Sequence, residues 1–455
     1  MDRLKVWNVI DLKKEYKLLG TTRVFKIDIK SAFLNAPLNK TVYLNIPQGL
    51  AIDRKQYCLH LNKEIYGLKQ APLAWYTRLQ KWLQNAVFVT SIFGKDIHIF
   101  KKEINNEFEI KDMGPPNLLL GMKISQLEEG IGMDQQHFVE SLLELYGMQD
   151  CKPVSTPLVP NKHLGPATEA ERIAFDSLQI NFRSAVGSIN YLIKATWPDL
   201  SFAVSSLSQY HEKPGIQHWR AFLHVLKYLC GTQEMGLWYS RKGEAGLIAY
   251  SNADWGNCRE TRRFTSGFLT HLHGCLIFWK TRKQPLVSIS TAEAEYKSLC
   301  DLTFELLWFH QLCQEVNILL LNTAITIWED NKSCINIANG NCNFNNKIMK
   351  HVDIQLHFVK EAIHSNLITL QYAPTTEMLA DFLTKSVPKP NFVWALAKLR
   401  ILRLEVRGDV EKQSHNELRL VNPSTKTLDY GLTCHRQRNI ASETYSDLTS
   451  IAQTT

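Results

Sequence analysis

The region between residues 246 and 388 most constrains the fold, because short apolar strands alternate there with helical stretches and acidic residues recur at their ends. In GLIAYSNADW, strand alternation places four side chains on one face: Ile248, Tyr250, Asn252 and Asp254. Strands that alternate with helices in this way predict a mixed α/β layer.

A hairpin and a helix follow this first strand. The stretch from 264 to 279 predicts the hairpin, with its turn near His273 and Gly274. Ser290 with Glu293 three residues later predicts a capping box at the start of the helix. One turn before the apolar stripe that begins at Leu299, Glu295 lies on the same helix face, whereas Glu293 does not. A carboxylate on a buried stripe is costly unless a cation or a donor meets it.

Two further acidic residues come from distant segments. ITIWED predicts a strand that ends in Asp330, and TEMLADFLTK predicts a helix that carries Asp381. Each acid alone is more typical of a solvated surface or a helix cap. As a set, Glu295, Asp330 and Asp381 favour a site in which two Mg²⁺ ions activate water and stabilise the leaving oxygen of a phosphodiester.

Five strings occur in order between residues 250 and 385: YSNADWGNCRETRRFTSGFL, SISTAEAEYKSLC, WEDNKSCINIANG, KHVDIQLHFVKEAI and ADFLTK. Together they resemble the ribonuclease H domain of copia-type LTR retrotransposon polyproteins. The resemblance implies a five-stranded mixed sheet with helices, and four carboxylates that bind two Mg²⁺ ions and hydrolyse the RNA strand of an RNA–DNA hybrid. Glu295, Asp330 and Asp381 match three of these positions. The fourth is an Asp in the family and is Asn252 here.

The Asn252 substitution has a direct physical consequence. An asparagine carbonyl can still contact a metal, but it lacks the charge that holds two divalent cations close together. Asp254 lies on the same strand face, but about 7 Å further along the strand. We therefore expect ribonuclease H activity to be lost or severely reduced.

The N-terminal region resembles a second part of the same polyprotein. VFKIDIKSAFLNAPL, VYLNIPQGL and IYGLKQAPLAWY are similar to the palm of copia-type reverse transcriptases. The resemblance implies that Asp28 chelates catalytic Mg²⁺ and that Phe33 excludes a ribose 2′-hydroxyl. It also implies that a loop containing Gly67, Lys69 and Gln70 frames the incoming nucleotide and the template.

Two parts of that polymerase are missing from the sequence. The family supplies its other metal-binding carboxylates from a tyrosine-x-Asp-Asp hairpin, and this chain contains no Asp-Asp dipeptide. Most of the fingers segment is also absent between WNVIDLKKEYKLLGTTRVFKI and DIKSAFLN. One metal-binding Asp cannot build a two-ion clamp, so we expect polymerase activity to be lost as well.

Composition and length are consistent with several globular domains. The chain has 455 residues, a net charge of +8 and ten cysteines without a C-x-x-C pair, which favours an intracellular protein with reduced thiols and without a membrane span. The predicted architecture is α/β and α+β. It comprises a truncated palm (1–150), a helical connection (151–245), a ribonuclease H-like domain (246–388) and a polar tail that lacks a core of its own (400–455).

Basic residues around the predicted hairpin suggest partners. Arg262, Arg263 and Lys280 could neutralise the phosphates of RNA, DNA or an RNA–DNA hybrid, although a charged sheet edge explains them equally well. His351 matches the family string without a mechanistic role. Three hypotheses stay open: a fragment with residual nuclease activity, a non-catalytic hybrid-binding remnant, and a decayed element that does not fold.

Overall fold

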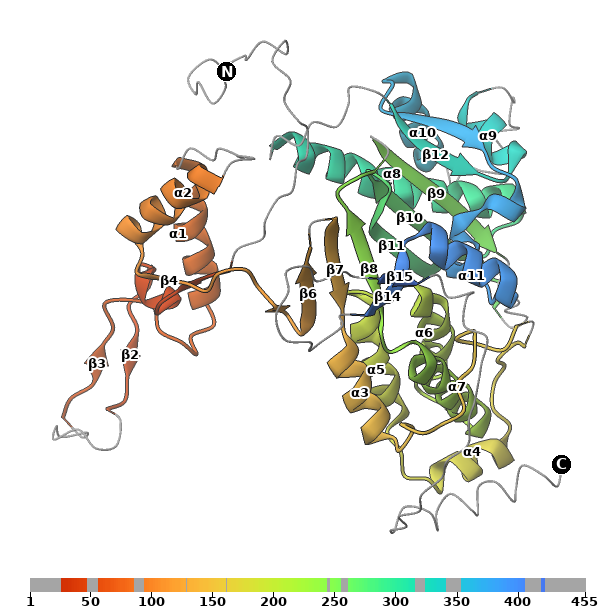
Figure 1. Cartoon of the computed structure of the whole chain (residues 1–455), viewed down its shortest axis with the longest axis horizontal. Helices are drawn as coiled ribbons and strands as arrows, with labels where there is room; N and C mark the ends of the chain where they lie inside the picture. Colours follow the sequence, from red (N-terminus) through yellow and green to blue (C-terminus); the bar gives the residue numbers. More distant parts are fainter. Residues whose placement is uncertain are drawn as a thin grey trace. The chain divides into compact units, whose positions relative to one another are not determined.

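The structure, a computed structural model, describes about three quarters of the chain (Figure 1). The chain divides into two compact units, residues 1–117 and 118–455. The described residues are 26–46, 56–85, 94–127, 129–160, 162–243, 246–254, 261–315, 324–340, 353–405 and 419–421.

The first unit contains two small antiparallel sheets and two helices. Strand β1 (Ile27–Ile29) pairs with β4 (Ile110–Asp112), and β2 (Tyr43–Leu44) pairs with β3 (Leu59–His60). A 3-10 turn, η1 (Ala32–Asn35), follows β1. Helix α1 (Ala71–Asn85) contributes the rings of Trp75 and Trp82, which pack on Phe108 just after helix α2 (Gly94–Glu107).

The second unit is built on two sheets. The first is an antiparallel six-stranded sheet with the order β15-β14-β8-β7-β6-β5. Its strands are β5 (Leu118–Leu119), β6 (Met122–Gln126), β7 (Gly130–Asp134), β8 (Met235–Ser240), β14 (Ile401–Glu405) and β15 (Arg419–Val421). Segments that are distant in the sequence therefore pair in one sheet.

Helices pack against this sheet over one continuous apolar core. They are α3 (Gln136–Leu145), α4 (Glu169–Asp176), α5 (Phe182–Ile193), α6 (Ser201–Ser208), α7 (Ile216–Thr232) and α11 (Lys389–Lys398), with the 3-10 turn η2 (Pro198–Leu200) before α6. Fully buried Leu192, Phe222 and Leu226 belong to this core. The buried face of α7 includes Trp219, Phe222 and Leu229, and Gly231 lies inside its last turn.

The second sheet is the predicted five-stranded mixed sheet, with the order β11-β10-β9-β12-β13. Strands β9 (Leu247–Asp254), β10 (Thr265–Leu272) and β11 (Cys275–Lys283) are antiparallel, and β12 (Ile325–Glu329) and β13 (Ile368–Tyr372) run parallel to β9. The β10–β11 turn falls at His273 and Gly274, where it was predicted, and both residues have positive φ.

Both faces of the five-stranded sheet are covered. Helices α8 (Thr291–Glu315), α9 (Lys332–Ala338) and α10 (Asp353–His364) pack on one face, where Ala249, Phe268 and Ile327 are fully buried (Figure 1). Leu269 and Leu276 face the other way and join the core of the six-stranded sheet. The two sheets of this unit therefore share a packed interior.

The end of the ribonuclease H-like region differs from its prediction. TEMLADFLTK forms two 3-10 turns, η3 (Thr375–Glu377) and η4 (Leu379–Leu383), instead of a helix. Residues 401–405 belong to β14 and not to a polar tail, because buried Ile401 and Leu404 anchor them beside β8.

The apolar core and the compact units cross the predicted domain limits. The core of the six-stranded sheet takes residues from both sides of 150, 245 and 388, and those limits stay predictions. Among the described helices, none combines the length and the apolar character needed to cross a membrane.

Candidate metal centre

Glu295 lies near the start of α8, just after its first turn, and points towards the sheet, as predicted. It is 5% exposed, and its carboxylate accepts a hydrogen bond from the backbone N–H of Ala253 on β9. Ser298, one turn further along α8, donates to the backbone oxygen of Asn252 at 3.0 Å. These two contacts fix the register between the helix and the strand.

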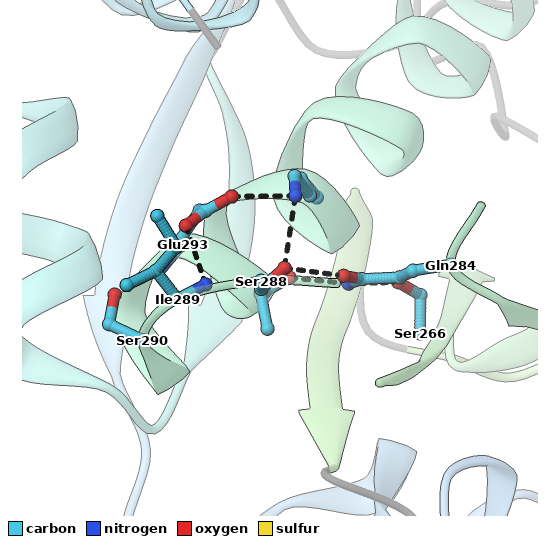
Figure 2. Close-up of polar contacts among 8 residues, drawn as sticks. Ser266, Gln284, Ser288, Ile289, Ser290 and Glu293 are labelled. Atoms are coloured by element: carbon cyan, nitrogen blue, oxygen red, sulfur yellow. Dashed lines mark hydrogen bonds and ion pairs between the residues drawn. The ribbon is translucent and has the colours of Figure 1, made fainter. Parts of the chain in front are cut away.

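The start of α8 is held by a polar network beneath the β11–α8 loop (Figure 2). Lys297 forms an ion pair with buried Glu293 at 2.6 Å and donates to Ser288 Oγ at 3.0 Å. Ser288 in turn donates to Gln284 Oε1 at 2.9 Å, and Glu293 accepts from the backbone N–H of Ile289 at 2.9 Å. Glu293 therefore fixes the helix start, while Glu295 faces the sheet.

Asn252 and Asp381 contact each other directly. The Asn252 side-chain amide donates to Asp381 Oδ1 at 2.6 Å and to Thr384 Oγ1 at 3.2 Å. Lys385 Nζ approaches the same Asp381 oxygen at 2.8 Å. Burial raises the pKa of Asp381, while Lys385 acts to lower it. The amide group at position 252 and the ammonium group of Lys385 thus both satisfy one carboxylate.

A second group of acids lies at the end of β12. One carboxylate oxygen from each of Glu295, Glu329 and Asp330 lies within 4.8 Å of the other two. Burial, followed by repulsion from neighbouring carboxylates, raises the pKa of Glu295 and of Glu329 well above the ordinary range. Within the described part of the chain, this is the one group of three acids, histidines or cysteines with metal-ligand spacing.

Glu329 and Lys385 are the residues that sequence reasoning missed. Glu329 shares the buried phase of β12 with Ile325 and Ile327 and is completely buried. That alternation could have identified it, because a carboxylate in phase with buried isoleucines needs a partner. Lys385 gives no comparable signal, since lysine after an acidic helix or turn is common on surfaces.

The three residues predicted to contact phosphates differ in their exposure and in their ion pairs. Arg262 and Arg263 are exposed just before β10. Lys280 forms an ion pair with Glu305 at 2.8 Å, and its ammonium lies 5.7 Å from the centre of the Phe268 ring. The two arginines are therefore the more accessible of these cations.

The predicted polymerase residues lie in the first unit. Asp28 is exposed on β1, paired with Lys111 of β4, and is outside the acid group described above. Phe33 packs on Tyr66 with ring centres 4.6 Å apart. Gly67, with φ of 96°, Lys69 and Gln70 lead into α1, whose first turn includes a hydrogen bond from the Ala74 N–H to the Gln70 carbonyl. His351 lies outside the described residues.

Known proteins similar to this chain include retrotransposon polyproteins. A family model described as reverse transcriptase (RNA-dependent DNA polymerase) matches residues 5–94 and 85–160. The retrovirus-related Pol polyprotein from transposon TNT 1-94 of Nicotiana tabacum is 30% identical over 81% of this chain, and that from transposon RE2 of Arabidopsis thaliana is 30% identical over 83%.

This chain spans 30% and 28% of those two polyproteins. Among solved structures, a foamy viral protease–reverse transcriptase in complex with an RNA/DNA hybrid covers 86% of this chain. That match has a TM-score of 0.41 and 14% identity, and it includes 46% of the viral chain.

Proposed function

The chain belongs to the family of copia-type retrotransposon Pol polyproteins, and on that basis we propose that it is a reverse transcriptase and ribonuclease H segment with two incomplete catalytic centres. In the family, such segments synthesise DNA on RNA and hydrolyse RNA in RNA–DNA hybrids inside the cell. Under this proposal, residues 1–150 are a truncated palm, 151–245 a connection and 246–388 a ribonuclease H-like domain.

The single observation that carries the proposal is the hydrogen bond from Asn252 to Asp381. A family carboxylate at position 252 would coordinate a metal, whereas the amide here donates a hydrogen bond to Asp381 Oδ1 at 2.6 Å. Lys385 adds a positive charge at the same oxygen. This side of the centre is therefore close to neutral, which disfavours a second divalent cation.

Mg²⁺ is the cofactor that the family implies. The donor groups fit one divalent cation and not two: Glu295, Glu329 and Asp330 offer clustered carboxylate oxygens, whereas Asp381 is occupied by an amide and an ammonium group. A bound cation would supply charge neutralisation there. The two-ion hydrolysis of phosphodiesters lacks its full ligand set.

The first unit supports the same conclusion for polymerisation. Asp28 is the matched metal-binding residue, and the sequence supplies no Asp-Asp pair to accompany it. The family model matches in two segments, 5–94 and 85–160, which overlap at residues 85–94. The catalytic hairpin is expected to be missing at this point of the chain. Phe33, Gly67, Lys69 and Gln70 would then be remnants of a nucleotide site.

The second candidate function is hybrid binding without cleavage. Exposed Arg262 and Arg263 lie at the end of β10 that pairs with Asp254, near the centre, and could contact hybrid phosphates. Binding would weaken steeply as salt increases, because each neutralised phosphate releases counterions.

One set of assays separates these functions. The full chain is incubated with a labelled RNA–DNA hybrid and with a primed RNA template in Mg²⁺, and we expect neither cleavage nor primer extension. Hydrolysis or templated extension at an ordinary enzymatic rate would refute the proposal. Salt-dependent retention of the uncleaved hybrid supports the binding function, and loss of a cooperative unfolding transition would refute both functions in favour of a decayed, unfolded product.

A further inference from the structure

The end of β12 brings three carboxylates together from two elements. Glu295 lies near the start of α8, Glu329 ends β12, and Asp330 follows it. Their nearest oxygens lie within 4.8 Å of one another. This spacing fits three oxygens around one metal ion, since such oxygens bind Mg²⁺ or Mn²⁺ at roughly 2.0–2.2 Å.

Each of the three carboxylates is held in place through a hydrogen bond. Glu295 accepts from the Ala253 N–H, Glu329 Oε1 accepts from the Asn331 N–H at 3.2 Å, and Asp330 Oδ2 accepts from Thr375 Oγ1 at 2.9 Å. Orientation by neighbouring donors is what metal-binding carboxylates usually require.

The second carboxylate oxygen of Glu295 and of Glu329 indicates that a ligand binds here. Glu295 is 5% exposed and Glu329 is 0% exposed, and Oε2 of each has no hydrogen-bond partner within the described part of the chain. Burial raises the pKa of both glutamates, and repulsion from neighbouring carboxylates raises it further. A buried, unpaired carboxylate oxygen is costly, and a cation at this point would satisfy both at once.

We propose that Glu295, Glu329 and Asp330 form a site for one divalent cation, with Glu329 supplying the negative charge that is lost at Asn252. Glu329 is outside the four positions matched to the family, so the site is displaced towards β12 and away from Asp381. An all-oxygen donor set selects Mg²⁺, Mn²⁺ or Ca²⁺ over softer metals. The inference rests on the proposed function for the loss of the two-ion centre, but it does not require any catalytic activity.

The experiment is a Mn²⁺ titration of the full chain without nucleic acid. Electron paramagnetic resonance of free Mn²⁺ gives the stoichiometry and the dissociation constant, and thermal melts with and without Mn²⁺ give an independent readout. The variants are Glu329→Gln, Asp381→Asn and, as a control for the loss of one charge, Glu361→Gln on the exposed face of α10.

We expect one Mn²⁺ per parent chain, about tenfold or more weaker binding in Glu329→Gln, and unchanged affinity in Glu361→Gln. Mn²⁺ should raise the melting temperature of the parent and not that of Glu329→Gln. Each variant is compared with itself, so a change in its intrinsic stability does not affect this result.

The contrary results are equally specific. Equal affinity in the parent and in Glu329→Gln, or a larger loss in Asp381→Asn than in Glu329→Gln, would overturn the displaced site. Because the titration contains no hybrid, its failure would leave the proposed function to be judged by cleavage and extension assays alone.

Discussion

Replacing Asn252 by aspartate tests how charge is balanced in the candidate metal centre. The amide nitrogen lies 2.6 Å from Asp381 Oδ1, so an ionised oxygen in its place would repel Asp381 by about 6 kcal/mol at an effective dielectric constant of about 20. Lys385 Nζ lies 2.8 Å from the same Asp381 oxygen and is therefore also close to the new carboxylate. We expect its attraction to the new charge to offset about half of this repulsion. The net expected loss of unfolding free energy is about 3 kcal/mol without divalent cations.

The assay is thermal unfolding of Asn252→Asp and parent at pH 8, with and without millimolar MgCl₂. A loss of about 3 kcal/mol corresponds to a melting temperature lower by about 6 °C or more. Mg²⁺ should recover most of the difference, because a cation between two carboxylates replaces repulsion by attraction. The variant should also gain Mg²⁺-dependent cleavage of an RNA–DNA hybrid.

The pH dependence of Asn252→Asp has a defined sign. Repulsion and burial raise folded-state carboxyl pKa values, so the folded state is favoured at low pH and loses stability as pH rises. The deficit should therefore be smaller at pH 5 than at pH 8. Asn366→Asp, at an exposed position, serves as control. A variant as stable as the parent at pH 8 without Mg²⁺, or one that Mg²⁺ fails to rescue, would refute the reasoning.

Three other substitutions probe the second unit. Burial raises the pKa of Asp199 to about 6. Its contribution to the free energy of unfolding therefore falls by about 3 kcal/mol as pH rises from about 4 to about 6. Asp199→Asn should make the melting temperature depend less on pH across that range. Gly267→Ala would place Cβ 2.6 Å from Thr384 Cγ2 and should cost about 1–3 kcal/mol in chemical denaturation; an unchanged midpoint would contradict the close packing. Lys297→Met would leave Glu293 buried without its cation and should cost about 3–5 kcal/mol by the same measurement, whereas a neutral outcome would show that the pair is dispensable.

The sequence predicted a mixed α/β layer and the inward face of Glu295 because both follow from regular periodicity, whereas the five-stranded sheet was implied by the family resemblance. Strand alternation and the helical repeat fix which side chains face a core, irrespective of distant contacts. The hairpin turn was also predictable, because glycine suits the positive φ of a two-residue turn, which Gly274 adopts beside His273.

Features that depend on tertiary contacts were not predictable in this way. The segment of Asp381 has helix-forming composition, but it forms 3-10 turns because Gly267 and β10 pack closely against Leu383. The orientation of the Asn252 amide depends on Asp381, which is distant in sequence. Glu329 was passed over because the adjacent Asp330 carries the family match, although alternation alone places Glu329 inside.

The pairing of β14 with β8 has a practical consequence for anyone expressing part of this chain. A fragment that stops at residue 388 would remove Ile401 and Leu404 and leave one side of β8 without its hydrogen-bonding neighbour. An uncapped strand of this kind invites intermolecular pairing and insolubility. A fragment for the ribonuclease H-like region should therefore begin before β5 and continue through Glu405, well beyond the last acidic residue of the centre.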